Sequence, residues 1–214
     1  MNIKHSQTEN YHDMANDLKW SKRAITFDEK KYDHFRHMQK KLISLINPAK
    51  NVNFLDIGCG TGWAVCYVEE LLKGEGNFIG VDISEGMIDK ARKKAEFLKN
   101  ISFYKTSAEE IPLESDYFEI IICTNSFHHY SNPEKAMLEI YRLLKPAGKI
   151  YILDITTDDF LVKWINKRVS RREKEHVKFY STHEYKEMFK KAGLQYLKSK
   201  MIWHYPLKVH IAKK

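Results

Sequence analysis

The fold of this chain is decided by one stretch, Asn53-Phe54-Leu55-Asp56-Ile57-Gly58-Cys59-Gly60-Thr61-Gly62-Trp63. Its first half is an apolar run that predicts a buried strand, and three glycines spaced one residue apart then interrupt the run. After the last glycine, apolar residues recur at steps of three and four, which predicts a helix. Glycine tolerates positive φ and lets a ligand approach the main chain, and free N–H groups at a helix start favour polar or anionic ligand groups. The stretch therefore predicts a strand, a ligand-binding loop and a helix.

The position of Asp56 indicates which charge the ligand group beside it should have. This acid stands two residues before the first glycine, at the carboxyl end of the predicted strand. Dinucleotide-binding chains usually have the spacing Gly-x-Gly-x-x-Gly with a pyrophosphate over the loop, and a carboxylate here would repel that group. It suits a ligand with an ammonium group instead, so a nicotinamide oxidoreductase is disfavoured. The alternative is a glycine turn with a capping aspartate and no ligand.

Length and composition indicate one folded domain in a reducing compartment. The chain has 214 residues, 43% of them hydrophobic, which is enough for one α/β domain with a full core and a small cap. It has no run near the ~20 apolar residues of a membrane span and no apolar N-terminal stretch of the signal-peptide kind. Its three cysteines form no Cys-x-x-Cys pair, and an odd number disfavours a disulfide framework. We therefore expect a cytoplasmic protein without a transmembrane segment.

The net charge of +8 is concentrated near the C-terminus. Residues 159–214 hold 15 Lys/Arg and 5 Asp/Glu, a net charge of +10, whereas residues 1–158 hold 21 and 23, a net charge of −2. Within the C-terminal portion, segment 163–178 has seven basic and two acidic residues. This asymmetry predicts an anionic partner, and the alternative is a solvated surface that aids solubility.

From residue 52 onward, strands and helices alternate. Helices are predicted between most of the strands, which we place at about 52–57, 77–82, 101–104, 118–124 and 149–155. The predicted helix N-caps are Ser84, Asn132 and Ser181, the last with a capping box. The helix before the fifth strand is expected to end at residues 145–148. Two closing strands, at about 195–203 and 206–212, are joined so tightly that they should be antiparallel.

These elements predict an α/β fold with a doubly wound, mostly parallel, seven-stranded Rossmann-like sheet and an antiparallel closing strand. Residues 1–50 are predicted to form an N-terminal helical cap, of which segment 1–30 should close over the ligand. Residues 51–214 form the main domain, with a basic insertion at about 156–180. Ligands of such sheets bind at the carboxyl ends of the strands, so the residues just after each strand are the candidates.

Asp82 is the candidate after the second strand, 20 residues beyond Gly62. A carboxylate at that strand end can accept hydrogen bonds from both hydroxyls of a ribose, and its alternative role is to start a helix cap. Met87, one turn into the following helix, either faces an adenine ring or fills the core.

Four further segments complete a resemblance to a known family. They are Val81-Asp82-Ile83-Ser84-Glu85-Gly86-Met87, Thr106-Ser107-Ala108-Glu109-Glu110-Ile111-Pro112, Thr124-Asn125-Ser126-Phe127-His128-His129-Tyr130 and Leu144-Lys145-Pro146-Ala147-Gly148-Lys149. With the glycine loop, they resemble the UbiE-like branch of the class I S-adenosylmethionine (SAM) methyltransferases, the group called methyltransferase domain 11. The resemblance covers about residues 53–155.

The resemblance implies SAM as the cofactor and S-adenosylhomocysteine as its product. Asp56 would face the methionine ammonium, the backbone of the glycine loop would hold the carboxylate, and Asp82 would hold the ribose. Ser107 and Ala108 would meet the adenine edge, although the family often has an aspartate where this chain has Ser107. The predicted cofactor-binding residues are Asp56, Gly58, Cys59, Gly60, Gly62, Asp82, Ile83, Met87, Ser107, Ala108 and Asn125.

The resemblance also implies methyl transfer by in-line displacement, and because this group methylates many acceptors, the small-molecule acceptor that we expect is our own interpretation. Because the leaving group of a sulfonium is neutral, the enzyme mainly positions the reactants and excludes water. His128 and His129 lie where an acceptor would approach, and either is a candidate base if the acceptor must lose a proton. The alternative is that the pair shapes its loop. Two histidines lack the three or four ligands of a metal site, so no metal is expected.

Two other functions stay open. The basic C-terminal portion favours an RNA methyltransferase, but Asn125 is followed by Ser126-Phe127 rather than by the Pro-Pro that resembles base-amine methyltransferases. Cys123 also lacks the preceding proline that a cytosine-C5 nucleophile commonly has, and no RNA-binding module is visible. The other is a non-catalytic SAM-binding subunit. The acceptor of a small-molecule enzyme would be anionic if segment 163–178 attracts it.

Overall fold

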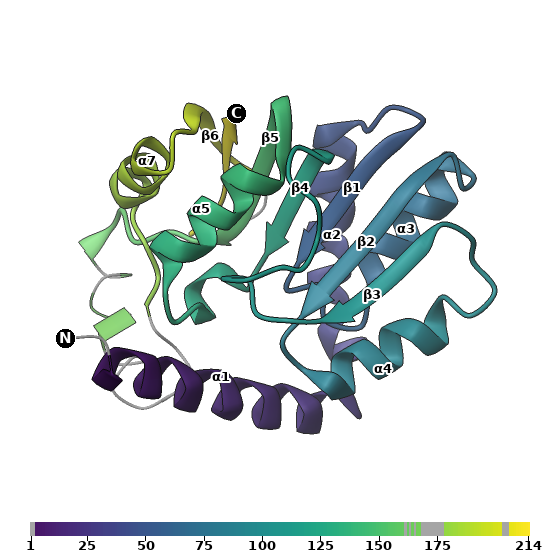
Figure 1. The fold of residues 1–214 in the computed structure, drawn as a ribbon, viewed down its shortest axis with the longest axis horizontal. Helices are drawn as coiled ribbons and strands as arrows, with labels where there is room; N and C mark the ends of the chain where they lie inside the picture. Colours follow the sequence, from purple (N-terminus) through teal and green to yellow (C-terminus); the bar gives the residue numbers. More distant parts are fainter. Residues whose placement is uncertain (1–2, 161, 163, 165, 168–177, 203–205) are drawn as a thin grey trace.

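The computed structural model describes residues 3–160, 162, 164, 166–167, 178–202 and 206–214, with side chains from residue 12 onward except that of residue 31. Its centre is a seven-stranded sheet in the order β3-β2-β1-β4-β5-β7-β6 (Figure 1). The strands are β1 (Val52–Ile57), β2 (Gly76–Asp82), β3 (Ile101–Lys105), β4 (Phe118–Thr124), β5 (Leu144–Ile155), β6 (Gln195–Met201) and β7 (Leu207–Lys213).

The predicted sheet is confirmed. β1 pairs in parallel with β2 and β4, and the pairs β2–β3 and β4–β5 are also parallel. β7 pairs antiparallel with both β5 and β6, as the closing strands were expected to do. The chain runs outward from β1 to β3 and then returns to β4 on the other side of β1. The boundary between β1 and β4 is therefore the switch point at which doubly wound sheets bind ligands.

Helices cover both faces of the sheet (Figure 1). One buried cluster includes Ile140 of α5 and Phe189 of α7, and the other includes Leu42 of α2, Val68 of α3 and Ile88 of α4. Because both faces are covered, the central parallel strands are apolar along most of their length. The helices are α2 (Asp33–Ile46), α3 (Trp63–Leu72), α4 (Glu85–Lys94), α5 (Pro133–Leu143) and α7 (Thr182–Lys191).

Local signals predicted the helix starts correctly. Ser84, Asn132 and Ser181 each accept a hydrogen bond from a backbone N–H in the first turn of α4, α5 and α7. Ser181 also forms the predicted capping box with Glu184.

Two helices precede the sheet. The first is α1 (Ile3–Ala24), and a turn and the short 3-10 helix η1 (Lys30–Tyr32) connect it to α2. α1 lies along the edge of the sheet at which the parallel strands end, below the sheet in Figure 1. It is therefore placed where a cover over the strand ends would lie.

The fifth strand begins earlier than predicted. β5 starts at Leu144 rather than at about residue 149, because Leu144 pairs with Phe118 beside a bulge in the ladder. The Ala147 N–H donates to the Lys214 carbonyl, and the Lys214 N–H donates to the Gly148 carbonyl, each at 3.0 Å. Residues 145–148, where the preceding helix was expected to end, are thus part of the sheet, since long-range pairing outweighs local preference.

Most of the basic segment 163–178 lies outside the described residues, as does Tyr205, which lies in the short connection between the two predicted closing strands. In the part of the chain that the structure describes, no helix has the length and apolar character needed to cross a membrane.

Candidate active site

The glycine loop between β1 and α3 has the backbone that its sequence predicts. Gly58, Gly60 and Gly62 have φ angles of +75°, +54° and +73°, in the left-handed region. A Cβ atom at Gly58 would lie 2.4 Å from Ser126 Oγ, and one at Gly62 would lie 2.6 Å from the Phe103 ring. Only glycine fits both this conformation and this space. The loop is therefore held tightly between residues that follow β4 and residues of β3.

Asp82 connects this loop to the start of α4. Its Oδ2 accepts a hydrogen bond from the Gly60 N–H at 2.8 Å, and its Oδ1 accepts one from the Ser84 N–H at 2.9 Å. Burial raises the pKa of Asp82 above its ordinary value, and the two N–H donors act in the opposite direction. A carboxylate has about four acceptor sites, so Asp82 keeps capacity for the hydroxyls of a ligand.

Asp56, near the end of β1, is fully buried. Neither of its carboxyl oxygens has a hydrogen-bond partner among the described residues. Burial, with the neighbouring Asp82 carboxylate as the second cause, raises the pKa of Asp56 to about 8. The ionised form of a buried acid without a partner is costly, and a positive group that comes close stabilises it. The surroundings of Asp56 thus fit a cationic ligand group and oppose an anionic one.

A cavity that is partly open to solvent lies at the strand ends. Three predicted site residues lie outside its lining: Asp56, Gly62, which packs against Phe103, and His128. The structure brings the others together around the cavity, and they are Gly58, Cys59, Gly60, Asp82, Ile83, Met87, Ser107, Ala108, Asn125 and His129.

The other wall of the cavity comes from the N-terminal cap, which the sequence alone could not place. Phe27 stacks on Tyr32 and Phe35, with ring centroids 4.8 Å and 5.9 Å apart, and Trp20 meets Phe27 edge-on at 6.2 Å. The available signal was this set of aromatic residues in an otherwise polar segment. The cap residues in the lining are Asp13, Asn16, Trp20, Phe27, Asp28, Tyr32, Phe35, Arg36 and Gln39.

Polar side chains fasten α1 to α4 and β3. Ser21 Oγ lies 2.9 Å from Ser84 Oγ and accepts a hydrogen bond from the Gly86 N–H at 3.0 Å. Asp17 accepts one from Lys105 Nζ at 2.8 Å. Although burial acts to raise it, the bonds from Lys105 and Ser21 hold the pKa of Asp17 below its usual value. Asp17 is thus held as a carboxylate in this contact.

Asp28, after α1, makes a second link, to the glycine loop. It accepts hydrogen bonds from Thr61 Oγ1 at 2.7 Å and from Lys94 Nζ at 3.1 Å. Burial acts to raise the pKa of Asp28, but Thr61 and Lys94 outweigh it and lower this pKa. The cap is therefore attached both to the loop and to α4.

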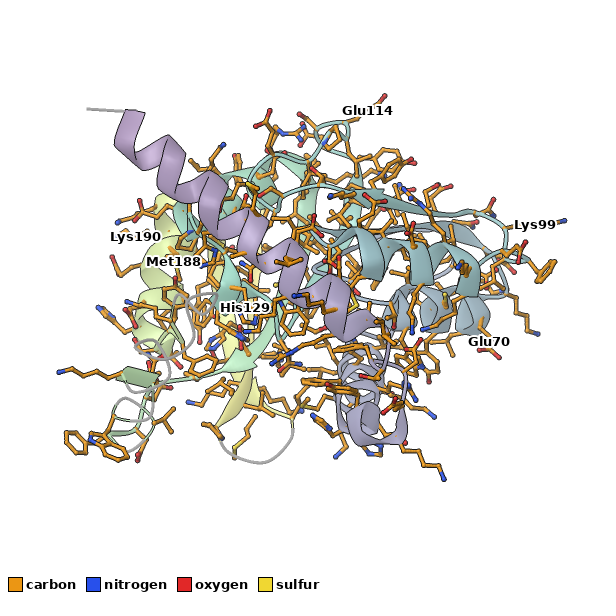
Figure 2. The ribbon with its side chains drawn as sticks, turned by 90° about the horizontal axis from the view of Figure 1, so that it is seen from below. Glu70, Lys99, Glu114, His129, Met188 and Lys190 are labelled. Atoms are coloured by element: carbon orange, nitrogen blue, oxygen red, sulfur yellow. The ribbon has the colours of Figure 1, made fainter. Side chains whose placement is uncertain are left out.

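The two candidate histidines are placed differently. His129 lines the cavity, and its ring meets Trp20 edge-on at 5.3 Å. The view from below in Figure 2 shows His129 close to α1. His128 instead contacts Asp154, with Nδ1 2.8 Å from Asp154 Oδ1 and its backbone N–H donating to Oδ2 at 3.2 Å. Asp154 is fully buried, and its place near the end of the fifth predicted strand was the signal that could have identified it.

Comparison with known proteins identifies the family. A family model described as a methyltransferase domain matches residues 48–193. The uncharacterized methyltransferase YcgJ of Bacillus subtilis is 29% identical over 191 residues, which cover 86% of this chain and 73% of that protein. The ubiquinone/menaquinone biosynthesis C-methyltransferase UbiE of Vibrio campbellii is 29% identical over 105 residues, which cover 48% of this chain and 40% of that protein.

Solved structures show the same fold. That of YcgJ has a TM-score of 0.68 and 28% identity, covering 77% of this chain and 72% of that chain. A SAM-dependent methyltransferase from Aquifex aeolicus has a TM-score of 0.72 and 21% identity, covering 90% and 97%. A Haloferax volcanii methyltransferase, solved in a complex with the Trm112 methyltransferase activator, has a TM-score of 0.78 and 19% identity, covering 91% and 96%.

The chain belongs to the methyltransferase domain family and is a SAM-dependent methyltransferase. This confirms the resemblance to the class I enzymes, with UbiE proteins among the relatives. The family match begins at residue 48, so α1 and α2 lie outside it.

Proposed function

We propose that this chain transfers a methyl group from SAM to a small-molecule acceptor bound in the same cavity. The observation that supports this most is the buried carboxyl group of Asp56, which lacks a partner and lies beside a glycine loop. When bound, SAM supplies a sulfonium-linked methyl group that is displaced in line and leaves a neutral thioether.

The lining residues at or just after the strand ends, from Ile57 to Trp63 and from Val81 to Tyr130, form what we call the sheet wall, and the cap residues form the cap wall. The sheet wall has a group for each part of this cofactor. Asp82 keeps acceptor capacity for the ribose hydroxyls. Met87 and Ala108 offer apolar surface for the adenine, and the Ser107 hydroxyl offers a polar edge. Asp56 lies outside the lining and is protonated without a ligand, but a nearby methionine ammonium would favour its ionised form and be attracted by that charge.

The cap wall is suited to exclude water and to hold the acceptor. Trp20, Phe27, Tyr32 and Phe35 present aromatic surface to the cavity. An in-line displacement with an activated donor depends mainly on such positioning and desolvation.

We assign the role of base to His129 where the acceptor must lose a proton. His129 lines the cavity, and an imidazole titrates near neutral pH. His128 is hydrogen-bonded to Asp154, and we assign it the positioning of the turn η2 (Phe127–His129).

The charges of the lining favour an uncharged or cationic acceptor. The described lining residues include the acids Asp13, Asp28, Asp82 and Glu109, against the cation Arg36. A cavity lined mainly by one sign of charge repels ligands of that sign. An anionic acceptor stays a prediction that rests on segment 163–178, most of which lies outside the described residues.

Binding and product analysis test the proposal. Calorimetry should show binding of SAM and S-adenosylhomocysteine and no comparable binding of NAD. Incubation with deuterium-labelled SAM and a metabolite library should then give a labelled small molecule by mass spectrometry. Tight NAD binding without SAM binding would overturn the cofactor assignment. Label transfer to RNA, with none to metabolites, would favour the RNA methyltransferase.

A further inference from the structure

Asn16, on α1, has a buried hydrogen-bond acceptor that no described residue satisfies. It lines the cavity and is 3% exposed. Its Nδ2 donates to the backbone carbonyl of His129 at 3.3 Å and lies 2.9 Å from His12 Nδ1. Its Oδ1 is buried without a partner among the described residues. Such an atom costs free energy until a donor reaches it.

The orientation of this amide follows from its contacts. A backbone carbonyl oxygen can only accept a hydrogen bond, so the amide atom that faces His129 must be the nitrogen. Rotating the amide by half a turn would set two oxygens against each other. The oxygen of Asn16 is therefore the unsatisfied atom, on a side chain that lines the cavity.

Aromatic rings line the same cavity as Asn16. Trp20 follows Asn16 by one helical turn and lines the same cavity. The Trp20 ring meets His129 edge-on at 5.3 Å and Phe27 at 6.2 Å. Asp13, nearly one turn before Asn16, adds negative charge to the lining. An unsatisfied acceptor on a cavity that is also lined by aromatic rings fits a flat, mostly apolar molecule with one donor group.

We propose that Asn16 Oδ1 accepts a hydrogen bond from the methyl acceptor, and that this acceptor is a small aromatic compound with an N–H or O–H group. The proposal rests on the proposed function, because it assumes that the acceptor binds in this cavity. It assigns recognition of the acceptor to α1, whereas the cofactor contacts come from the sheet. Asn16 binds the acceptor and neither gives nor takes a proton in the transfer.

Matched pairs of probes test this recognition in the protein saturated with S-adenosylhomocysteine. Aniline is compared with N,N-dimethylaniline, and phenol with anisole, by NMR titration. In at least one pair, the member with the N–H or O–H group should bind about tenfold more tightly than its methylated partner, which is the scale of one hydrogen bond. The pair that shows this preference distinguishes an amine from a hydroxyl compound.

Two variants separate recognition from anchoring of α1. Asn16→Leu removes both polar atoms, and Asn16→Asp keeps an oxygen acceptor but loses the N–H groups that face His129. If Oδ1 binds the probe, the preference is lost in Asn16→Leu and kept in Asn16→Asp. Loss in both variants would mean that Asn16 only anchors α1, and would overturn the proposal. Lys22→Leu, at an exposed position of the same helix, is the control and should keep the preference.

Failure of this proposal is distinguishable from failure of the proposed function. Equal affinities within both pairs, or no binding of any probe beside bound S-adenosylhomocysteine, overturn the role of Asn16 and leave the cofactor site standing. No binding of S-adenosylhomocysteine overturns the proposed function itself. Where Asn16→Leu does not fold, Asn16→Asp must still show the wild-type preference.

Discussion

The two walls of the cavity are held in place by different means. In the sheet wall, Gly58 has a left-handed backbone and Asp82 is bound by main-chain N–H groups. The cap wall is attached by side chains, such as Ser21 on Ser84. The family match covers residues 48–193 and so includes the first wall but not the second. The comparison teaches that the family match covers the wall held by main-chain contacts, whereas the wall held by side-chain contacts lies before that match.

Substitutions in the two walls should therefore have different consequences. In the sheet wall, a substitution should change the stability of the fold or the affinity for the cofactor. In the cap wall, it should change how readily α1 opens, because side-chain contacts can break while the sheet stays intact.

The largest effect is expected at Asp56, in the sheet wall. Its pKa is raised from 3.8 to about 8, so it stays protonated in the folded protein while the same group of the unfolded chain ionises. The unliganded fold therefore loses stability as the pH rises from about 4 to about 8. Asp56→Asn should raise the free energy of unfolding at pH 7 by on the order of 3 kcal/mol, with little change at pH 4. Urea unfolding at both pH values measures this.

Asp89→Asn is the control for this prediction, because Asp89 is an exposed acid on α4. It should show no gain that depends on pH. An equal gain at both pH values for Asp56→Asn, or none at pH 7, would contradict the account of a buried, protonated acid.

Gly62→Ala and Gly74→Ala separate backbone strain from crowding. The two residues have φ angles of +73° and +75°, but a Cβ atom would lie 2.6 Å from the Phe103 ring at Gly62 and 3.3 Å from the Glu69 carboxylate at Gly74. Both variants should lose about 1 kcal/mol to strain. Gly62→Ala should lose a further ~1–3 kcal/mol of its free energy of unfolding, because the added Cβ atom overpacks against Phe103. Urea unfolding compares them, and equal losses would show that Phe103 does not hold the loop.

Asp82→Ala should weaken binding of S-adenosylhomocysteine by about 1.5–3 kcal/mol, the scale of hydrogen bonds to a charged group. Both the expected ribose contacts and the bonds that order the loop are lost in this variant. Calorimetry measures the affinity, with Asp89→Ala as the exposed control on α4. An unchanged affinity would remove Asp82 from the cofactor site.

Ser21→Ala, in the cap wall, should have the smallest effect. It removes the contacts to Ser84 and the Gly86 N–H, so α1 should open more readily by about 0.5–1.5 kcal/mol while β1 stays protected. Hydrogen exchange measures this opening, and S-adenosylhomocysteine should restore protection of α1. Ser44→Ala, at an exposed site on α2, is the control. Equal protection of wild-type α1 with and without the ligand would count against a cover that closes.

The sequence was sufficient to predict which residues line the sheet wall, because each of them lies close in sequence to the end of a strand. Gly58, Asp82, Ser107 and Asn125 each follow a predicted strand, and parallel strands end at the same edge of a sheet. The start of β5 was predicted wrongly because it depends on partners distant in sequence: Leu144 pairs with Phe118, and Ala147 and Gly148 bond to Lys214.

The sequence predicted a cap over the ligand, but the contacts that hold this cap wall could not be predicted because their partners are distant in sequence. Asn16 contacts His129, which is 113 residues away, and Ser21 contacts Ser84, which is 63 residues away. No local pattern encodes such a pair, and the polar composition of segment 1–30 fits a loose segment as well as a helix.

Ser84 connects the two walls through a single turn of the chain. Its N–H donates to Asp82 Oδ1, and its Oγ lies 2.9 Å from Ser21 Oγ. A ligand bound by Asp82 and the closed position of α1 therefore both stabilise the conformation of this turn. Linkage then requires ligand binding and closure of α1 to strengthen each other by the same factor. For turnover, this coupling predicts that bound S-adenosylhomocysteine makes α1 open less readily. The turnover rate would then be limited by the opening of α1 that allows S-adenosylhomocysteine to dissociate.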